Sequence, residues 1–180
     1  MRALPLLAIS VPMQRIVILG NIGSGKSTLA RALGAKLGLP VVHLDRLFWE
    51  PGWTEPTTEN FRARLAPHLA DGRWITEGNY ISRTFDMRLP VCDTIVLLET
   101  PRWLCVWRAF WRTVLARPRP DLPEGCEEGM KGDLPQFLRD AWNFEPRRLR
   151  IEAAIPKMAA QARVVRLRTT REAERFVAGI

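Results

Sequence analysis

The sequence lacks long apolar runs and paired cysteines. No run of about 18 apolar residues occurs, so we expect no transmembrane helix. The three cysteines form no C-x-x-C pair, and an odd number cannot all pair within one chain. Because disulfides are rare in reducing compartments, this cysteine usage predicts a cytoplasmic protein.

Motifs of several nucleotide-binding and DNA-binding classes are also missing. The sequence has neither the N-K-x-D and D-x-x-G motifs of GTPases nor an L-S-G-G-Q-type transporter signature. It contains no helix-turn-helix or zinc motif that would read base edges. These absences argue against a GTPase, a transporter ATPase and a sequence-specific DNA reader.

The composition predicts a single globular domain with an anionic partner. The chain has 180 residues, of which 47% are hydrophobic, which suffices for one good core and is too little for two. A net charge of +8, from 27 Lys and Arg against 19 Asp and Glu, suits a nucleotide, a phosphorylated metabolite or nucleic acid without choosing among them.

Five short apolar runs alternate with helical patterns. Because these runs are apolar throughout, they predict strands that are covered on both faces, as in a parallel sheet. The alternation favours an α/β, doubly wound domain. The expected strands are 15–19, 41–44, 74–76, 94–98 and 163–167, and the expected helices are 26–37, 58–70, 101–116, 134–150 and 170–178.

Two segments fall outside this pattern. Residues 1–12 precede the first strand, and we expect them to be a non-core extension, with Met13 a plausible start and 13–180 a single domain. Between the fourth and fifth strands lie more than sixty residues, and 117–132 are rich in proline, glycine and charge. We interpret the region around 113–135 as a lid.

Directly after the first strand, Gly20 to Thr28 match G-x-x-x-x-G-K-[ST], the phosphate-binding P-loop. Its glycines let the backbone wrap phosphate oxygens at a helix N-terminus. Lys26 is expected to reach the β- and γ-phosphates of ATP, and the Ser27 hydroxyl to bind Mg²⁺. The predicted nucleotide-binding residues are Gly20, Asn21, Gly23, Ser24, Gly25, Lys26, Ser27 and Thr28.

Acidic residues follow the second and third strands, at the edge where open α/β sheets bind ligands. Asp45 is a candidate to accept or orient an acceptor hydroxyl, with Arg46 holding an anionic group; the alternative is a solvated pair or a helix cap. Glu77 is a candidate Mg²⁺ ligand through water, or a simple cap, and Gly78 permits close approach of a ligand. His43 is expected to be a satisfied core histidine.

The helix after the fourth strand carries tryptophans and arginines. Trp103, Trp107 and Trp111 recur every four residues and predict core packing. Arg108 and Arg112 occupy a neighbouring face, and we expect them to neutralise charge during phosphoryl transfer.

An aromatic segment, 48–53, follows Asp45 and predicts an acceptor pocket. Two tryptophans around Pro51 and Gly52 could stack on a planar ring such as a nucleobase, or the segment could simply anchor on the core. Of the two, Trp53 is expected to face the ligand.

The loop from Gly20 to Thr28 resembles that of adenylate-kinase-type P-loop kinases. The resemblance to these kinases covers nearly all of residues 14–180. This resemblance implies a five-stranded parallel sheet with helices on both faces, a helical lid, and ATP and Mg²⁺ as cofactors. It also implies lid arginines at Arg108 and Arg112, nine and thirteen residues after Glu99. The strings HLDRLFW, PGW, EGNY and TPRWLC resemble more closely the DNA topology modulation proteins, a kinase-like bacterial family.

Two functions are therefore predicted. The first is a kinase that transfers the γ-phosphoryl group of ATP to a small acceptor, for which a nucleotide is a candidate, with Lys26, Asp45, Arg108 and Arg112 in catalytic roles. The alternative is a nucleotide-responsive DNA-binding protein whose basic surface binds nucleic acid; it rests on charge alone.

Overall fold

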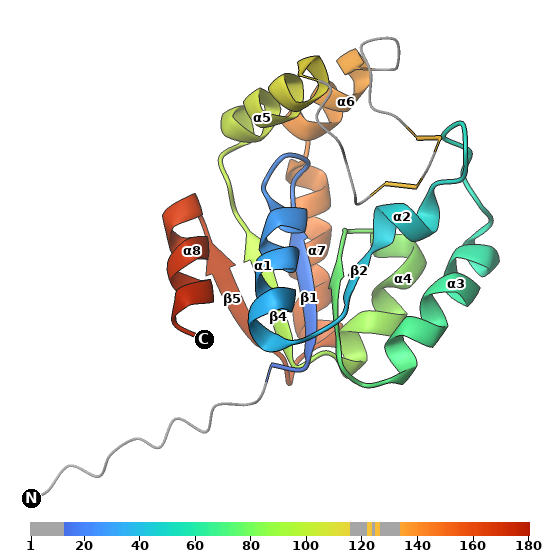
Figure 1. Cartoon of the computed structure of the whole chain (residues 1–180), viewed down its shortest axis with the longest axis vertical. Coiled ribbons are helices and arrows are strands. Elements are labelled where there is room, and N and C mark those ends of the chain that lie inside the picture. The colour runs from blue at the N-terminus through green and yellow to red at the C-terminus, as the bar shows by residue number, and fades with distance from the viewer. Residues whose placement is uncertain (1–12, 116–121, 124, 127–133) are drawn as a thin grey trace, which may run out of the picture.

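The computed structural model describes residues 13–115, 122–123, 125–126 and 134–180, and its centre is a five-stranded parallel sheet. The strand order is β2-β3-β1-β4-β5 (Figure 1). The strands span Arg15–Gly20 (β1), Val41–His43 (β2), Trp74–Glu77 (β3), Thr94–Leu98 (β4) and Arg163–Leu167 (β5).

The central strands are buried on both faces, as their apolar sequences predict. Every residue of β3 and β4 is buried, and so are the last five residues of β1. In the parallel register Ile18 lies beside Glu77 on one side and beside Val96 on the other. The carboxyl ends of β1 and β3 therefore meet at one edge, where the loop after β1 begins.

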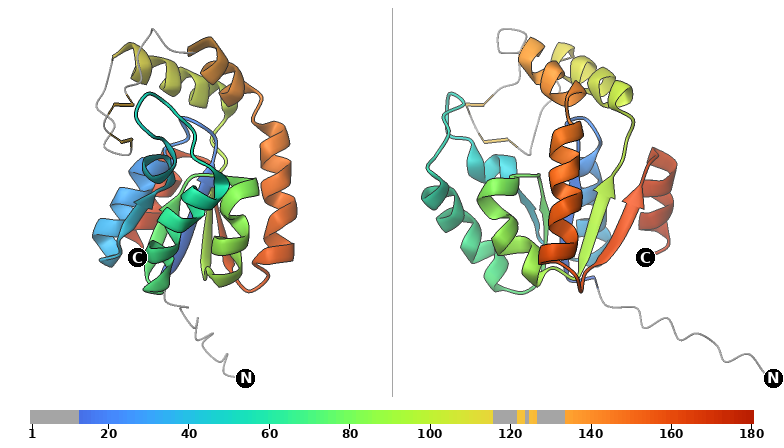
Figure 2. Two further views of the ribbon diagram at one scale, coloured as in Figure 1. Left: turned by 90° about the vertical axis from the view of Figure 1, so that its right-hand side faces the viewer. Right: turned by 180° about the vertical axis from the view of Figure 1, so that it is seen from behind.

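Helices cover both faces of the sheet. On one face α1 (Lys26–Leu37) buries Leu29 and Leu33 in a cluster with Ile16 and Ile18 of β1, and α8 (Thr170–Ala178) adds partly buried side chains to that cluster. On the other, α4 (Ile81–Arg88) and α7 (Glu145–Met158) pack on Val17 and Leu19 (Figure 2). The prediction of a five-stranded parallel sheet with helices on both faces is confirmed.

Five further elements complete the described chain. Helices α2 (Leu44–Phe48) and α3 (Thr58–Ala70) pack beside β2, and the short 3₁₀ helix η1 (Leu89–Val91) follows α4. Helices α5 (Arg102–Val114) and α6 (Leu134–Trp142) contact each other above the carboxyl edge of the sheet (Figure 1).

The sequence predicted most elements correctly and missed or merged others. The helix expected over 134–150 is two helices, α6 and α7. Pro146 explains the break, because proline has no N–H to bond the carbonyl of Trp142. Helices α2 and α4 were not predicted, since five and eight residues are too short to display a helical period.

The prediction that the tryptophans of α5 pack in the core is wrong. Trp103, Trp107 and Trp111 are 63%, 57% and 39% exposed. The buried face of α5 is formed by its small residues Cys105, Ala109 and Thr113. Figure 1 shows that α5 lies above the carboxyl edge of the sheet and not on one of its faces, so the sheet does not cover these tryptophans.

Two predicted segments lie wholly or largely outside the described residues. These are the extension over 1–12 and most of the lid around 113–135. Within the part of the chain that the structure describes, no helix is long and apolar enough to cross a membrane.

Candidate functional site

The loop between β1 and α1 has the backbone of an anion cradle. Gly23 and Gly25 have φ angles of +74° and +100°, a region that residues with a side chain rarely adopt. A Cβ atom at Gly23 would lie 2.3 Å from the carbonyl oxygen of Cys105, so α5 packs directly on the loop. At Gly25 such an atom would meet nothing within 4 Å, which leaves the N-terminus of α1 open to a ligand.

Side chains hold this loop in shape. Asn21 is buried, donates from Nδ2 to the carbonyl oxygen of Ala141 in α6 (2.7 Å), and accepts from the N–H of Ile22 (2.7 Å). Lys26 Nζ donates to the carbonyl oxygen of Asn21 (2.9 Å). The buried Ser24 Oγ has no hydrogen-bond partner among the described residues. The loop thus presents a lysine and N–H groups on a fixed frame.

Glu77 ends β3 beside the first turn of α1. Its Oε1 accepts from Ser27 Oγ (3.0 Å) and lies 2.8 Å from Nδ1 of His43. Burial opposes ionisation of Glu77, but the His43 hydrogen bond, the charge of Lys26 and the Ser27 hydrogen bond hold its pKa below the ordinary value. An ionised carboxylate beside a hydroxyl is a set of hard oxygen donors that suits Mg²⁺.

The His43 side chain is 13% exposed and hydrogen-bonded, as expected of a satisfied histidine. Its partner, however, is the Glu77 carboxylate of the candidate site, which His43 reaches from the end of β2. The parallel register pairs His43 with Glu77, which the sequence alone could not display.

The turn after β3 joins the two sides of the site. Asn79 bonds both the N–H (3.2 Å) and the carbonyl oxygen (2.9 Å) of Gly20, so it fixes the start of the P-loop. Tyr80 donates its hydroxyl proton to Oδ1 of Asp45 (2.8 Å). Burial and the Asp45 carboxylate raise the pKa of Tyr80, which therefore stays a donor. The sequence reasoning assigned no role to either residue.

Arg88 supports this turn from inside the protein. Its fully buried guanidinium donates to the carbonyl oxygens of Gly78 (3.2 Å) and Asn79 (2.7 Å), and to Thr84 Oγ1 (3.1 Å). Burial lowers the pKa of Arg88 to about 9, so it remains charged near neutral pH. No motif in the sequence distinguishes this arginine from the exposed ones.

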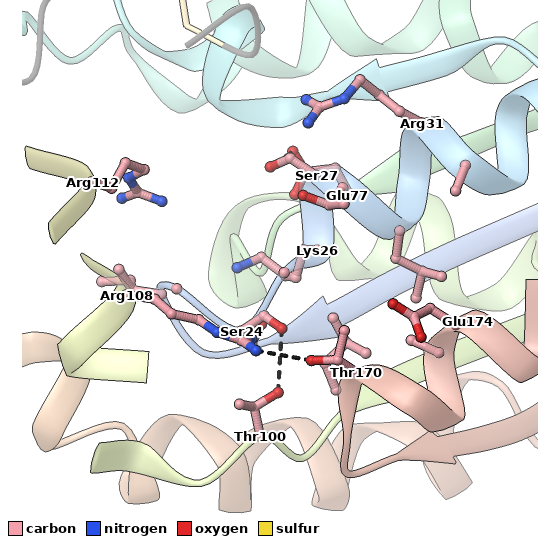
Figure 3. A pocket seen from close by; sticks show the side chains of 18 of the residues that line it. Ser24, Lys26, Ser27, Arg31, Glu77, Thr100, Arg108, Arg112, Thr170 and Glu174 are labelled. Atoms are coloured by element: carbon pink, nitrogen blue, oxygen red, sulfur yellow. Dashed lines mark hydrogen bonds between the residues drawn. The ribbon is translucent and has the colours of Figure 1, made fainter. Parts of the chain in front are cut away.

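The arginines of α5 reach the other side of the P-loop. Arg108 donates to Thr170 Oγ1 at the start of α8 (2.9 Å), which connects α5 to α8 (Figure 3). The guanidinium of Arg112 lies 5.7 Å from the ring centre of Phe137 in α6.

The P-loop, Asp45, Glu77 and the two arginines of α5 border one cavity of about 940 Å³ (Figure 3). Its lining also includes Trp107, Trp111 and Leu115, whereas Trp103 lies outside it. Of the predicted site residues it collects Gly23, Ser24, Gly25, Lys26, Ser27, Thr28, Asp45, Glu77, Arg108 and Arg112. The other five, Gly20, Asn21, Arg46, Trp53 and Gly78, lie outside its lining.

The aromatic segment divides between core and surface. Phe48 is buried against Phe61 and Tyr80, so it anchors the segment. Trp53 is 39% exposed and meets the edge of Trp49 at 5.2 Å between ring centres. Trp53 is therefore the more accessible of the two tryptophans, while its contact with a ligand remains a prediction.

Several solved structures resemble the chain over nearly its whole length. A shikimate kinase from Acinetobacter baumannii in complex with shikimate matches with a TM-score of 0.55 at 20% identity, over 93% of this chain and 90% of that one. A putative kinase from Chloroflexus aurantiacus matches with a TM-score of 0.56 at 16% identity, over 93% and 96%. The chain has the fold of the P-loop kinases.

Sequence comparison does not assign the chain to a family. No protein-family model matches the chain, and no curated relative matches it. The closer resemblance to DNA topology modulation proteins is therefore not confirmed. At such low identities the likeness establishes the fold, and the reaction has to be argued from the site.

Proposed function

We propose that this protein is an ATP-dependent phosphotransferase that acts on a small hydroxylated acceptor. One observation carries the proposal: the P-loop, Asp45 of α2, Glu77 of β3 and two arginines of α5 border the same cavity. Phosphoryl transfer needs this combination, because the enzyme acts by positioning the phosphates and neutralising their charge.

The cradle fits a nucleotide triphosphate. Positive φ angles at Gly23 and Gly25 and the open space at Gly25 allow phosphate oxygens to approach the backbone, and Lys26 lies within the lining. We assign ATP binding to Gly20, Asn21, Gly23, Ser24, Gly25, Lys26, Ser27 and Thr28. Gly20 and Asn21 would act through the loop backbone, since the Asn21 side chain is engaged with α6.

The donor set at Glu77 fits Mg²⁺. Ser27 would ligate the ion directly and Glu77 would hold it through water, with His43 fixing the carboxylate. A bound Mg²⁺ ion would neutralise negative charge on the phosphates. The ionised state of Glu77, favoured by His43 and Lys26, keeps these oxygens available as acceptors.

Asp45 is the candidate that orients the acceptor hydroxyl. Tyr80 donates to one carboxylate oxygen of Asp45, which fixes the direction of the other. Arg108 and Arg112 would neutralise the migrating phosphoryl group from the α5 side. Arg46, Trp53 and Gly78 remain candidates for acceptor contact from outside the cavity lining.

The neighbouring folds support the same reaction class without identifying the acceptor. The shikimate kinase and the putative kinase share this architecture over nine-tenths of this chain. The DNA-binding alternative is not favoured, because many exposed arginines already pair with carboxylates. These arginines include Arg62, Arg64, Arg83, Arg148 and Arg166.

Coupled ADP release tests the proposal. Nucleoside monophosphates, nucleosides and small hydroxylated metabolites would be screened with the wild-type protein and with Lys26→Ala. We expect acceptor-dependent ADP release that the substitution abolishes while the melting temperature is retained. Undiminished ATP consumption by the folded variant would contradict the proposal.

A further inference from the structure

Helix α1 carries a basic side chain that the proposed reaction does not yet use. Arg31 lies four residues after Ser27, and Gly34 follows three residues later, so the three share one face of the helix. A Cβ atom at Gly34 would lie 2.5 Å from Cγ2 of Val41, so this face of α1 is the one that packs toward β2. Arg31 therefore lies on the β2 side of α1.

Arg31 also lines the cavity. Figure 3 shows its guanidinium on the same side of Lys26 as Ser27 and Glu77, whereas Thr170 and Glu174 lie on the other side. Asp45, at the start of the helix that follows β2, lines the same cavity. Arg31 and Asp45 thus both border the β2 half of the cavity.

The charge of Arg31 is not compensated within the described chain. It is exposed, and among the described residues no carboxylate or carbonyl group bonds its guanidinium. Arg64 of α3 and Arg83 of α4 differ in this respect, because they are paired with Glu50 and Glu55. The described lining holds five basic and three acidic side chains, so it favours an anion: Lys26, Arg31, Lys36, Arg108 and Arg112 against Asp45, Glu77 and Glu174.

We propose that Arg31 binds an anionic group of the acceptor, a carboxylate or a phosphate monoester, while the acceptor hydroxyl faces Asp45. This inference rests on the proposed phosphotransferase function and narrows its substrates to anionic hydroxylated molecules. A guanidinium fits either group because its forked N–H donors match two oxygens at once.

The transfer itself balances within this arrangement. The acceptor oxygen forms a bond to the γ-phosphorus and gives its proton to Asp45. The bond from that phosphorus to the β–γ bridging oxygen breaks, and ADP leaves with the electron pair. Arg31 holds the acceptor and takes no part in bond making.

Binding measurements separate this role from catalysis. The protein would be saturated with a non-hydrolysable ATP analogue and Mg²⁺, so that the γ-phosphate position is filled. Gluconate, glucose 6-phosphate and AMP would then be titrated by calorimetry beside neutral glucose and adenosine. Arg31→Met keeps a good helix former, Arg31→Lys keeps the charge, and Arg73→Met is the control at the opposite end of β3.

We expect the wild-type protein to bind at least one anionic probe, and Arg31→Met to weaken that binding by about tenfold or more. Arg31→Lys should be intermediate, and Arg73→Met should match the wild type. Binding of gluconate alone would identify a carboxylate, whereas binding of glucose 6-phosphate or AMP would identify a phosphate.

Two results would overturn the role of Arg31. One is that no anionic probe binds, and the other is that Arg31→Met binds as tightly as the wild type. If the wild type and Arg31→Met released ADP equally with glucose or adenosine, the phosphotransferase function would be supported. Only the proposal of an anionic acceptor would then be wrong.

Discussion

The two halves of the cavity are built in different ways. The phosphate side is one continuous stretch of backbone, Gly20 to Thr28, with positive φ angles at Gly20, Gly23 and Gly25, and the side chains of Asn21 and Asn79 brace it. The β2 side is assembled from side chains distant in sequence, such as the bond from Tyr80 to Asp45 across 35 positions. An added side-chain atom in the P-loop therefore disturbs the phosphate side, whereas single substitutions on the β2 side can alter which acceptor binds.

The largest expected effect is steric and lies on the phosphate side. Gly23→Ala would place a Cβ atom 2.3 Å from the Cys105 carbonyl oxygen at a φ of +74°. We expect the dissociation constant for ATP to rise by at least about a hundredfold, or roughly 2.7 kcal/mol, as measured by calorimetry.

Gly38→Ala is the matched control for that substitution. Gly38 has a φ of +62°, but a Cβ atom there would meet nothing within 4 Å. It should cost about 1 kcal/mol of stability from backbone strain and leave ATP binding unchanged. Equal loss of ATP binding in both variants would show that backbone strain, and not the contact with α5, sets the loop.

On the side-chain half, Arg88→Met should have the largest effect. It leaves the buried carbonyl oxygens of Gly78 and Asn79 without their donors. We expect a loss of about 3 kcal/mol in the free energy of unfolding, measured by denaturant titration. A loss below about 1 kcal/mol would mean that the turn after β3 is held by other contacts.

Tyr80→Phe tests whether the β2 side of the cavity can be altered without affecting ATP binding on the phosphate side. The substitution keeps the ring packed on Phe48 and removes the hydrogen bond to Asp45. The lost hydrogen bond orients Asp45 and is worth about 1 kcal/mol. Its loss should raise the acceptor KM or lower kcat about fivefold and leave the ATP dissociation constant unchanged. An equal weakening of ATP binding would mean that the halves are one unit.

The smallest effect concerns an ion-pair network away from both halves. Arg166 bonds Glu152 (2.6 and 2.7 Å) and Glu99. Hydrogen bonding by Arg166 lowers the pKa of Glu152, and the bonds from Arg166 and Arg168 outweigh burial to lower the pKa of Glu99. Arg166→Met should cost about 1 kcal/mol at most at neutral pH, because the pairs are exposed.

The pH dependence of that cost has a definite sign. Carboxylates with lowered pKa values stabilise the native state above their unfolded pKa of 4.5, and lose this contribution as pH falls through their native values. Thermal melts of wild type and variant should therefore converge on acidification. A difference that persists at about pH 3 would assign the effect to packing.

The same contrast explains what the sequence could predict. The P-loop and the five strands follow from contiguous patterns, so Lys26, Ser27 and the buried runs were identified directly. His43, Asn79 and Arg88 act through partners that only the parallel register and the turn after β3 bring close. The tryptophans of α5 were misjudged because helical spacing predicts one apolar face without indicating whether a sheet covers it.

Product stoichiometry tests the central claim most directly. ATP, Mg²⁺ and each acceptor of the screen would be incubated with wild type and with Lys26→Ala, and the products resolved by mass spectrometry. We predict that the wild type forms a phosphorylated acceptor and ADP in equal amounts, and that the folded variant forms neither. Release of ADP with inorganic phosphate alone, whatever the acceptor, would contradict transfer across this cavity.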